Sequence, residues 1–410
     1  MPSSLSAEVE PLLVSPDFLD NPYPVYARLC ADEPVYWSDR WNCWLVTSYD
    51  DNMAIFRDTE RFGNGERFNR IFSVLPDDLR QELSLLEHHF VRAGGLIHAD
   101  PPAHTRLRKL VHLAFTPRTI REMTAQIEAI VAQLLDAVQS HGRMDVIRDF
   151  AYPLPATVIA RMLGVPEQDI GYFKQWSFDV LQFQTTGQAA PDVLHYSQTA
   201  LAGMRRYLKE LAAARRAEPR SDLMTELVKA EDEGDRLSED ELLATCVTLM
   251  IAGHETTTNL IANGLLLLLR NPDQLERLRA DRSLMPSAVE EFLRLESPIQ
   301  RNRRVVRRDT TYGGKTMQAG QVLFQMLGAA NRDPAVFRDA ATMDIARDPN
   351  PHIAFGFGIH FCLGAPLARL EAPIALNAIL DRMPDIRLAD AELKWESSIM
   401  RGLHALPVLF

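Results

Sequence analysis

The sequence predicts a mainly α-helical chain that also carries small β-sheets, an α+β fold. Two features of the residue pattern predict it: the extent of the helical spacing and the confinement of strand-like runs. Most of the chain has apolar residues at helical spacing, whereas short runs rich in β-branched and aromatic residues are confined to a few places. No stretch has the composition of a linker, a repeat or a low-complexity segment. Length alone, at 410 residues, is a prior for two or three average domains.

The strand candidates lie in two places. Residues 35–37 and 43–47 flank a polar turn at 38–42, which predicts a hairpin. Residues 316–326 predict further short strands around a turn at Ala319-Gly320. Elsewhere the pattern is helical, and apolar residues within 123–138 recur at the spacing of an amphipathic helix that packs on one face.

The composition is that of a soluble globular protein, with 46% hydrophobic and 24% charged residues. No apolar run approaches the roughly 20 residues that a membrane helix needs, and the N-terminus lacks the basic and apolar regions of a signal peptide. A cytoplasmic protein without a membrane anchor is therefore expected. The net charge of −11 argues against nucleic acid as a partner, because phosphate binding needs a positive face.

The four cysteines are scattered without C-x-x-C spacing, which indicates reduced thiols rather than a disulfide framework or a zinc site. They are Cys30, Cys43, Cys246 and Cys362. Only the last has a chemically special context.

A long helix is predicted to begin at the capping box of residues 238–241 and to end before Asn271-Pro272. Its middle reads Ala252-Gly253-His254-Glu255-Thr256-Thr257, and this glycine and these threonines weaken a helix. Local rules broken inside a buried helix often mark a functional site.

Two interpretations of this segment stay open on chemistry alone. In the first, Ala252 and Gly253 leave space for a small ligand, while Thr256 bonds the carbonyl of Ala252 and opens a groove for a water. Glu255 could then supply protons through that water. In the second, the segment is a packing defect and Glu255 is merely salt-bridged. The zinc-protease pattern H-E-x-x-H fails because position 258 is Thr258.

Residues 351–371 contain a glycine-spaced loop that runs directly into a strong helix former. Cys362 lies at or just before the predicted helix N-terminus, where unpaired N–H groups and the helix dipole favour the thiolate, a soft metal ligand suited to iron. The glycines at 356, 358 and 364 let the backbone turn tightly and let a flat cofactor lie against it.

There are three other interpretations of this loop: a phosphate-binding loop, a zinc site and an inert buried cysteine. The first two are weaker, and the third stays open. A phosphate-binding G-x-G-x-x-G would need glycine at position 361, which is Phe361. A zinc site would need further ligands at short spacing. An inert buried cysteine in a glycine-rich turn is not excluded by the chemistry of the loop alone.

The pattern F-G-x-G-x-H-x-C-x-G, from Phe355 to Gly364, resembles the haem-binding signature of the cytochrome P450 family. The long helix also matches the family's A-G-x-[DE]-T motif at residues 252–256, and residues 291–294 match its E-x-x-R motif, with Arg347 as a third member. The resemblance extends over the whole chain and is weakest at residues 61–95 and 170–195, which correspond to variable substrate-recognition regions.

The resemblance implies a single P450 domain over residues 1–410, with the long distal helix over a haem. It implies that Cys362 is the metal ligand, the axial thiolate of a haem b (iron protoporphyrin IX), and that Glu255 and Thr256 form the catalytic acid–alcohol pair. Buried haem propionates need cationic or donor partners. The residues assigned to the cofactor are Cys362, His360, His104, Arg108, Arg304, Phe355, Gly356, Gly364, Ala252 and Gly253, with Arg303 as the alternative to Arg304.

The implied activity is that of a haem-thiolate monooxygenase, which inserts one atom of O2 into an organic substrate. A peroxide-driven peroxygenase is a rival, but it would not need the Glu255–Thr256 pair. A non-catalytic haem-thiolate gas or redox sensor is the alternative from another class, and it would usually carry an output domain.

The substrate is expected to be small and lipophilic. Two sets of residues are candidates for the pocket: Phe173, Trp176, Phe178 and Phe183, for which an ordinary core role is equally favoured, and Ile299, Gln300, Ile399 and Met400 by family position. Electrons are expected from NAD(P)H through a reductase and a ferredoxin, docked on a basic patch of Arg106, Lys109, Arg118 and Arg121. A monomer is expected.

Overall fold

The computed structural model describes residues 4–65, 68–93, 95–186, 190–232, 234–396 and 399–410. The packing of the backbone divides the chain into two compact units. Unit 1 comprises Met1–Gly63, Glu128–Tyr152 and Thr256–Phe410, and unit 2 comprises Asn64–Ile127 and Pro153–Glu255. Nothing in this division tests whether residues 1–410 form a single domain, so that stays a prediction.

Unit 1 combines helices with most of the strands. Its helices and helical turns are α1 (Ser4–Leu12), α2 (Pro16–Asp20), α3 (Tyr23–Asp32), α4 (Tyr49–Arg57), η3 (Ile147–Ala151), α16 (Pro272–Ala280), η5 (Arg282–Leu284), α17 (Met285–Leu295), α18 (Leu327–Ala330), η6 (Gly358–His360) and α19 (Ala365–Arg382). Its strands are β1 (Val35–Ser38), β2 (Cys43–Val46), β3 (Phe62–Gly63), β4 (Arg143–Asp145), β7 (Asn302–Val306), β8 (Thr310–Tyr312), β9 (Lys315–Met317), β10 (Val322–Gln325), β11 (Arg387–Leu388) and β12 (Pro407–Leu409).

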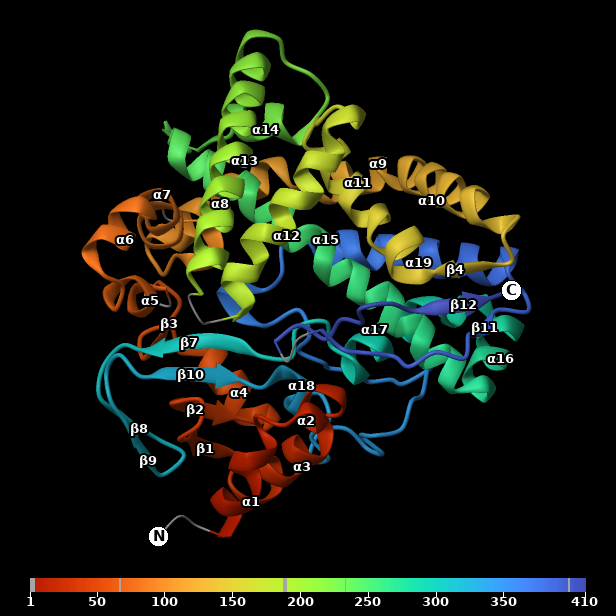
Figure 1. Cartoon of the computed structure of the whole chain (residues 1–410), viewed down its shortest axis with the longest axis horizontal. Helices are drawn as coiled ribbons and strands as arrows, with labels where there is room; N and C mark the ends of the chain where they lie inside the picture. The colour runs from red at the N-terminus through yellow and green to blue at the C-terminus, as the bar shows by residue number, and fades with distance from the viewer. Residues whose placement is uncertain (1–3, 66–67, 94, 187–189, 233, 397–398) are drawn as a thin grey trace. The chain divides into compact units, whose positions relative to one another are not determined.

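The largest sheet has the strand order β1-β2-β10-β7-β3 (Figure 1). The predicted hairpin is confirmed, because β1 and β2 pair antiparallel with Val35 opposite Val46. The strands predicted within 316–326 are also confirmed as β9 and β10, but they belong to different sheets: β9 pairs with β8, and β10 pairs with β2 and β7. A three-stranded sheet has the order β11-β12-β4.

Both faces of the β1–β2 hairpin are buried. Successive side chains of a strand point to opposite faces. Tyr36 and Leu45 accordingly pack into a core with α1 and α3, whereas Val35 and Val46 pack into a second cluster with α4. This packing positions α4, and Phe56 of α4 lies next to Gly356 and Gly358 in the loop that contains Cys362.

Unit 2 is almost entirely helical. Its helices and helical turns are α5 (Asn69–Ser73), α6 (Asp77–Glu82), α7 (Ser84–Glu87), η1 (His88–Arg92), η2 (Leu96–His98), α8 (Ala103–Ala114), α9 (Pro117–Glu122), α11 (Pro153–Met162), η4 (Glu167–Asp169), α12 (Ile170–Thr186), α13 (Pro191–Ala217) and α14 (Leu223–Lys229). A small hairpin joins β5 (Glu231–Asp232) to β6 (Asp235–Arg236). Helices α12 and α13 lie side by side (Figure 1), and Gly203 permits this, since a Cβ there would lie 3.0 Å from the indole of Trp176.

Two helices contain residues of both units. Helix α10 (Thr124–Gln139) confirms the amphipathic helix predicted at 123–138. Helix α15 (Glu239–Arg270) is the predicted long helix; its 32 residues correspond to about 48 Å of axial rise. The capping box is confirmed as a reciprocal pair, in which Glu241 N donates to Ser238 Oγ at 3.2 Å and Ser238 N donates to Glu241 Oε2 at 2.8 Å. The helix-rich α+β fold class is therefore confirmed.

None of the helices in the described ranges combines the length and the hydropathy needed to cross a membrane.

Candidate active site

The cysteine loop of unit 1, residues 355–364, turns back on itself directly before α19. Its two ends are joined by the Cys362 N–H, which donates to the carbonyl of Phe355 at 2.9 Å. Gly364 caps α19, and the second residue of that helix is Pro366, which loses no helical hydrogen bond there. Cys362 is half-buried two residues before the cap, as predicted. Its thiol is thus held at a helix N-terminus, where the thiolate is favoured.

Two glycines give the loop its tight course. Gly356 and Gly358 have φ values of +70° and +73°, which residues with a Cβ rarely adopt. A Cβ on Gly358 would also lie 3.0 Å from the carbonyl oxygen of Phe56 in α4. Both glycines therefore serve the turn and its close contact with α4.

The cysteine loop presents apolar side chains at its surface. Three apolar residues close to Cys362 are exposed: Phe357, Ile359 and Phe361, each by 37–38%. Apolar side chains gathered in this way mark a binding surface. A partly exposed cysteine beside exposed apolar side chains would fit a flat, apolar, metal-containing group such as haem.

The E-x-x-R pair, Glu291 and Arg294 of α17, is fully buried. Arg294 donates to both carboxylate oxygens of Glu291, at 2.8 and 2.7 Å, and Arg347 donates to the same carboxylate at 3.1 and 3.2 Å. The Asp344 N–H and the Asn350 amide also donate to Glu291. The attraction of Glu291 would raise the pKa of the Arg294 guanidinium, but burial outweighs it and lowers that pKa.

These bonds bind irregular backbone to a helix. Besides holding Glu291, Arg294 donates to the carbonyls of Asn331, Ala340 and Thr342. The segment between α18 and the cysteine loop, residues 331–354, has no helix or strand of its own. Hydrogen bonds from the Arg294 side chain of α17 thus take the place of the regular backbone hydrogen bonds that this segment lacks.

A second anchor was missed by the sequence reasoning. Arg369 of α19 donates to both oxygens of Glu290 in α17, at 2.7 and 2.8 Å, and His352 bonds the same carboxylate at 2.8 Å. Burial would raise the pKa of Glu290, but these bonds outweigh it and lower the pKa to about 2. Glu290 directly precedes the E-x-x-R motif, and its partners lie 62 and 79 residues further on, so no local pattern indicated the contact.

Of the predicted propionate contacts in unit 1, Arg304 is nearly buried and its guanidinium stacks on Phe56 at 5.5 Å. The same ring would lie 3.7 Å from a Cβ on Gly356, so the structure brings Arg304 and the cysteine loop together around Phe56. His360 is half-buried at the end of η6. Arg301 stacks instead on Trp41 and Phe324, at 4.1 and 5.0 Å.

In unit 2, the predicted His104 and Arg108 both lie on α8. His104 is almost fully buried, and burial followed by the nearby Arg108 lowers the pKa of its imidazole. Arg108 is half-buried and donates to His112 Nε2 at 3.0 Å. Burial and Arg108 thus favour the neutral form of the His104 imidazole, and Arg108 carries the positive charge.

The middle of α15 has one open face, which lies between the buried stretches 242–247 and 257–266. Ala252 is exposed, and Thr248, Glu255 and Thr256 are partly exposed, at the spacing of one helical stripe. Gly253 has a packing role, since a Cβ there would lie 3.3 Å from Ile159 of α11. The helix continues unbroken through this segment. Unit 2 ends at Glu255 and unit 1 resumes at Thr256.

The aromatic residues predicted as either pocket roof or core are separated by the structure. Phe173 is buried and its ring packs against Trp176 and Tyr207, with centroids 5.2 and 4.9 Å apart. Phe183 is buried against Phe68 and other aromatic rings, whereas Phe178 is 46% exposed. Packing within unit 2 thus accounts for Phe173 and Trp176.

The predicted basic patch is partly engaged inside unit 2. Arg106 donates to Asp235 at 3.1 Å and to Glu241 at the start of α15. Arg118 pairs with Glu122 on the surface of α9 at 2.8 Å. The partners of Arg106 lie more than a hundred residues away, so sequence reasoning counted it as a surface charge.

Comparison with known proteins gives a consistent result. A family model described as "Cytochrome P450" matches residues 178–383. A protein of Bacillus subtilis (strain 168) named "Biotin biosynthesis cytochrome P450" is 41% identical over 401 residues, which cover 97% of this chain and 98% of that protein. "Cytochrome P450 monooxygenase PikC" of Streptomyces venezuelae is 41% identical over 402 residues, with 96% and 92% covered.

A solved structure resembles the whole chain as well. The crystal structure of P450BioI in complex with hexadec-9Z-enoic acid ligated acyl carrier protein aligns with a TM-score of 0.87 at 40% identity. The alignment covers 96% of this chain and 100% of that chain.

Proposed function

The chain belongs to the cytochrome P450 family and is a P450 monooxygenase, and from this premise we propose that Cys362 is the axial thiolate ligand of a haem b. Family membership implies the haem. The observation that supports the ligand is the half-exposed thiol at the start of α19, surrounded by Phe357, Ile359 and Phe361. When bound, the haem supplies the activation of dioxygen, from which one oxygen atom enters an organic substrate.

The protein's part at the cysteine is to keep the sulfur ionised and in place. The bond from the Cys362 N–H to Phe355 and the tight turns at Gly356 and Gly358 fix the sulfur relative to α19. The helix N-terminus stabilises the thiolate. Arg369, bonded to Glu290, adds positive charge near the sulfur without leaving its own anchor.

For the haem propionates we propose His360 and Arg304 from unit 1 and His104 and Arg108 from unit 2. A buried carboxylate needs charge-assisted or neutral hydrogen bonds. Arg304 and Arg108 supply positive charge, and the imidazole of His104 supplies a ring N–H donor. The packing of Arg304 on Phe56, beside Gly356, supports Arg304 over Arg301 and Arg303.

For proton delivery we propose the carboxyl of Glu255 and the hydroxyl of Thr256. Both lie on the partly exposed stripe of α15 next to Ala252, whose small side chain leaves that face open. The carboxyl can hold and release a proton, and the hydroxyl can accept and pass one on. The pair also argues against a peroxygenase, and the match to monooxygenases over the whole chain gives the sensor alternative no support.

For substrate and partners we propose a lipophilic organic molecule and electrons from NAD(P)H through a ferredoxin and its reductase. Because Arg106 is bonded inside unit 2, docking would fall mainly to Lys109 and Arg121, both exposed, with Arg118. A cytoplasmic location and a monomeric state stay predictions.

The test is the carbon-monoxide difference spectrum of the dithionite-reduced protein, taken for the natural chain, Cys362→Ser and Cys30→Ser. Cys30 is the matched control, since it is also half-buried and belongs to unit 1. A strongly red-shifted Soret band is expected in the natural chain and in Cys30→Ser, and its loss is expected in Cys362→Ser. A red-shifted band that survives in haem-loaded Cys362→Ser would overturn the assignment.

A further inference from the structure

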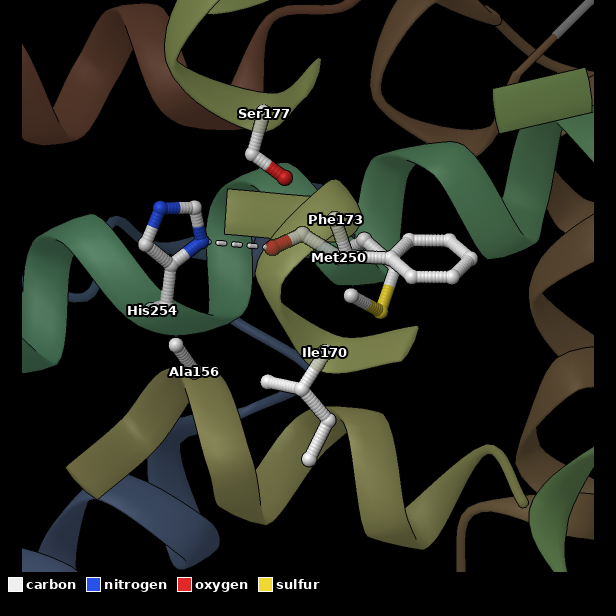
Figure 2. A pocket seen from close by; sticks show the side chains of 6 residues that line it. All are labelled: Ala156, Ile170, Phe173, Ser177, Met250 and His254. Atoms are coloured by element: carbon white, nitrogen blue, oxygen red, sulfur yellow. Dashed lines mark hydrogen bonds between the residues drawn. The ribbon is translucent and has the colours of Figure 1, made fainter. Parts of the chain in front are cut away.

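A small pocket in unit 2 lies between α11, α12 and α15 (Figure 2). Its lining residues are Ala156, Ile170, Phe173, Ser177, Met250 and His254. The lining is mainly apolar, and the space is too narrow to admit a water molecule. His254 is only 2% exposed, so its imidazole lies in a dry environment where electrostatic interactions are strong.

The ring of His254 is fixed in one tautomer. Its Nδ1 lies 2.7 Å from the carbonyl oxygen of Met250, four residues earlier on α15 (Figure 2). A carbonyl oxygen only accepts hydrogen bonds, so Nδ1 must carry a hydrogen. In the neutral ring, Nε2 is then a bare acceptor.

That acceptor faces a carboxylate. Nε2 of His254 lies 3.8 Å from Oε2 of Glu255, although adjacent residues of a helix ordinarily point apart. A bare nitrogen lone pair and an ionised carboxylate repel each other, and the burial of His254 strengthens this repulsion. The arrangement becomes favourable when the two groups together hold one proton, as an imidazolium beside a carboxylate, because 3.8 Å is within the range of an ion pair.

We propose that His254 is a positioning residue for Glu255: together the two side chains hold one proton, and their attraction keeps that carboxyl in place for proton delivery. This rests on the proposed role of Glu255. In the resting protein the pair carries that one proton. When Glu255 passes it on, the pair regains one proton from solvent through the partly exposed carboxyl, and nothing is oxidised or reduced.

The shared proton has a consequence for pH dependence. A lone carboxyl loses its proton near pH 4.3, whereas the pair keeps its one proton into a more neutral range, because the carboxylate stabilises the imidazolium. Among the described residues that line the pocket from α11 and α12, none titrates in this range, so Glu255 is the acid that His254 meets there. Proton delivery should therefore persist to higher pH with His254 than without it.

The first test measures the pair itself, without turnover. Histidine labelled with ¹⁵N is followed by NMR in the diamagnetic ferrous carbon-monoxide form as pH is varied, with His254 assigned by its absence in His254→Asn. In Glu255→Gln the pKa of His254 should fall by about one pKa unit or more, because the neighbouring negative charge is gone. An unchanged pKa overturns the proposal.

The second test uses turnover and a variant that keeps the anchoring bond. The amide of His254→Asn can still donate to the Met250 carbonyl but cannot hold a titrating proton. The pH at which product formed per NADH consumed falls to half should move down by about one pH unit or more. Ser177→Ala, which alters the same pocket on α12, should leave that midpoint in place.

These measurements distinguish a failure of the proposed role of Glu255 from a failure of the positioning role of His254. If Glu255→Gln leaves product per NADH unchanged, the proposed role of Glu255 is wrong and the inference falls with it. If Glu255→Gln lowers product per NADH while His254→Asn keeps the natural midpoint, the role of Glu255 stands and the positioning role of His254 is wrong.

Discussion

The cysteine loop and the middle of α15 are stabilised by opposite means. The loop and the irregular segment before it depend on charged side chains of α17: Glu291 and Arg294 are fully buried, and Glu290 binds Arg369. The middle of α15 is held by its own backbone hydrogen bonds and by apolar contacts such as Ile159 against Gly253. Irregular backbone must find partners in side chains, whereas a helix has them already. Reactive side chains on a helix can therefore be changed at little structural cost.

The largest loss of folding stability is expected when Arg294 is replaced. Arg294→Leu leaves the Glu291 carboxylate buried and removes its bidentate partner as well as three bonds to irregular backbone. Breaking one side of a buried ion pair costs about 3–5 kcal/mol, so the free energy of unfolding should fall by that amount.

Urea denaturation followed by circular dichroism measures this loss. Arg118→Gln, which breaks the exposed Arg118–Glu122 pair on α9, is the control and should change nothing measurable. A loss of under about 1 kcal/mol for Arg294→Leu would mean that the triad is not what holds this segment.

A smaller effect is expected at Gly358. Gly358→Ala places a Cβ at a φ of +73° and 3.0 Å from the Phe56 carbonyl oxygen. Gly314→Ala is a matched control, because Gly314 has a φ of +72° and no neighbouring atom within 4 Å of its Cβ position. The left-handed backbone should cost both variants about 1–2 kcal/mol.

The difference between these two variants isolates the contact with α4. Gly358→Ala should lose additional stability and should also show a smaller red-shifted carbon-monoxide band at equal haem content. Equal losses and equal bands in both variants would mean that the loop can move away from Phe56 at no cost.

How far the sequence predicted these regions depends on how local the information is. The capping box at Ser238, the hairpin of β1 and β2 and the position of Cys362 before α19 involve neighbouring residues, and all three agree with the structure. The α+β fold class followed from the same local periodicity.

What the sequence did not predict involves residues far apart along the chain. The Glu290–Arg369–His352 cluster and the Arg106–Asp235 pair each join elements whose proximity only the fold determines. The same holds for β9 and β10, which are neighbours in sequence but pair with different strands. Gly253 was attributed to space for a ligand, and its contact with Ile159 depends on where α11 packs.

The Glu290 cluster gives a prediction for acid stability. The low folded pKa of about 2 lies below the value of about 4.3 expected in the unfolded chain. Its stabilisation is therefore fully present above the unfolded pKa and is lost as the pH falls toward 2. The difference in free energy of unfolding between the natural chain and Glu290→Gln should be constant above about pH 5 and shrink below it. A difference that stays constant down to pH 3 would contradict this prediction.

The smallest effect on stability is expected at Thr256, and it tests the open face of α15 most directly. Thr256→Ala removes a partly exposed hydroxyl from a helix that keeps its backbone bonds, so the free energy of unfolding should stay within about 0.5 kcal/mol of the natural value. Product per NADH consumed should nevertheless fall several-fold, with the missing electrons recovered as peroxide, because proton delivery loses its alcohol.

Thr257→Ala is the matched control for this last prediction, since it removes the same hydroxyl one residue further along, where the side chain is buried. It should cost more stability than Thr256→Ala and leave product per NADH unchanged. Such a result would show that the two threonines have different roles: the buried Thr257 side chain stabilises the fold, and the partly exposed Thr256 side chain serves the reaction. If both variants lost stability and kept their coupling, the open stripe of α15 would have only a packing role, and the proton-delivery assignment would be wrong.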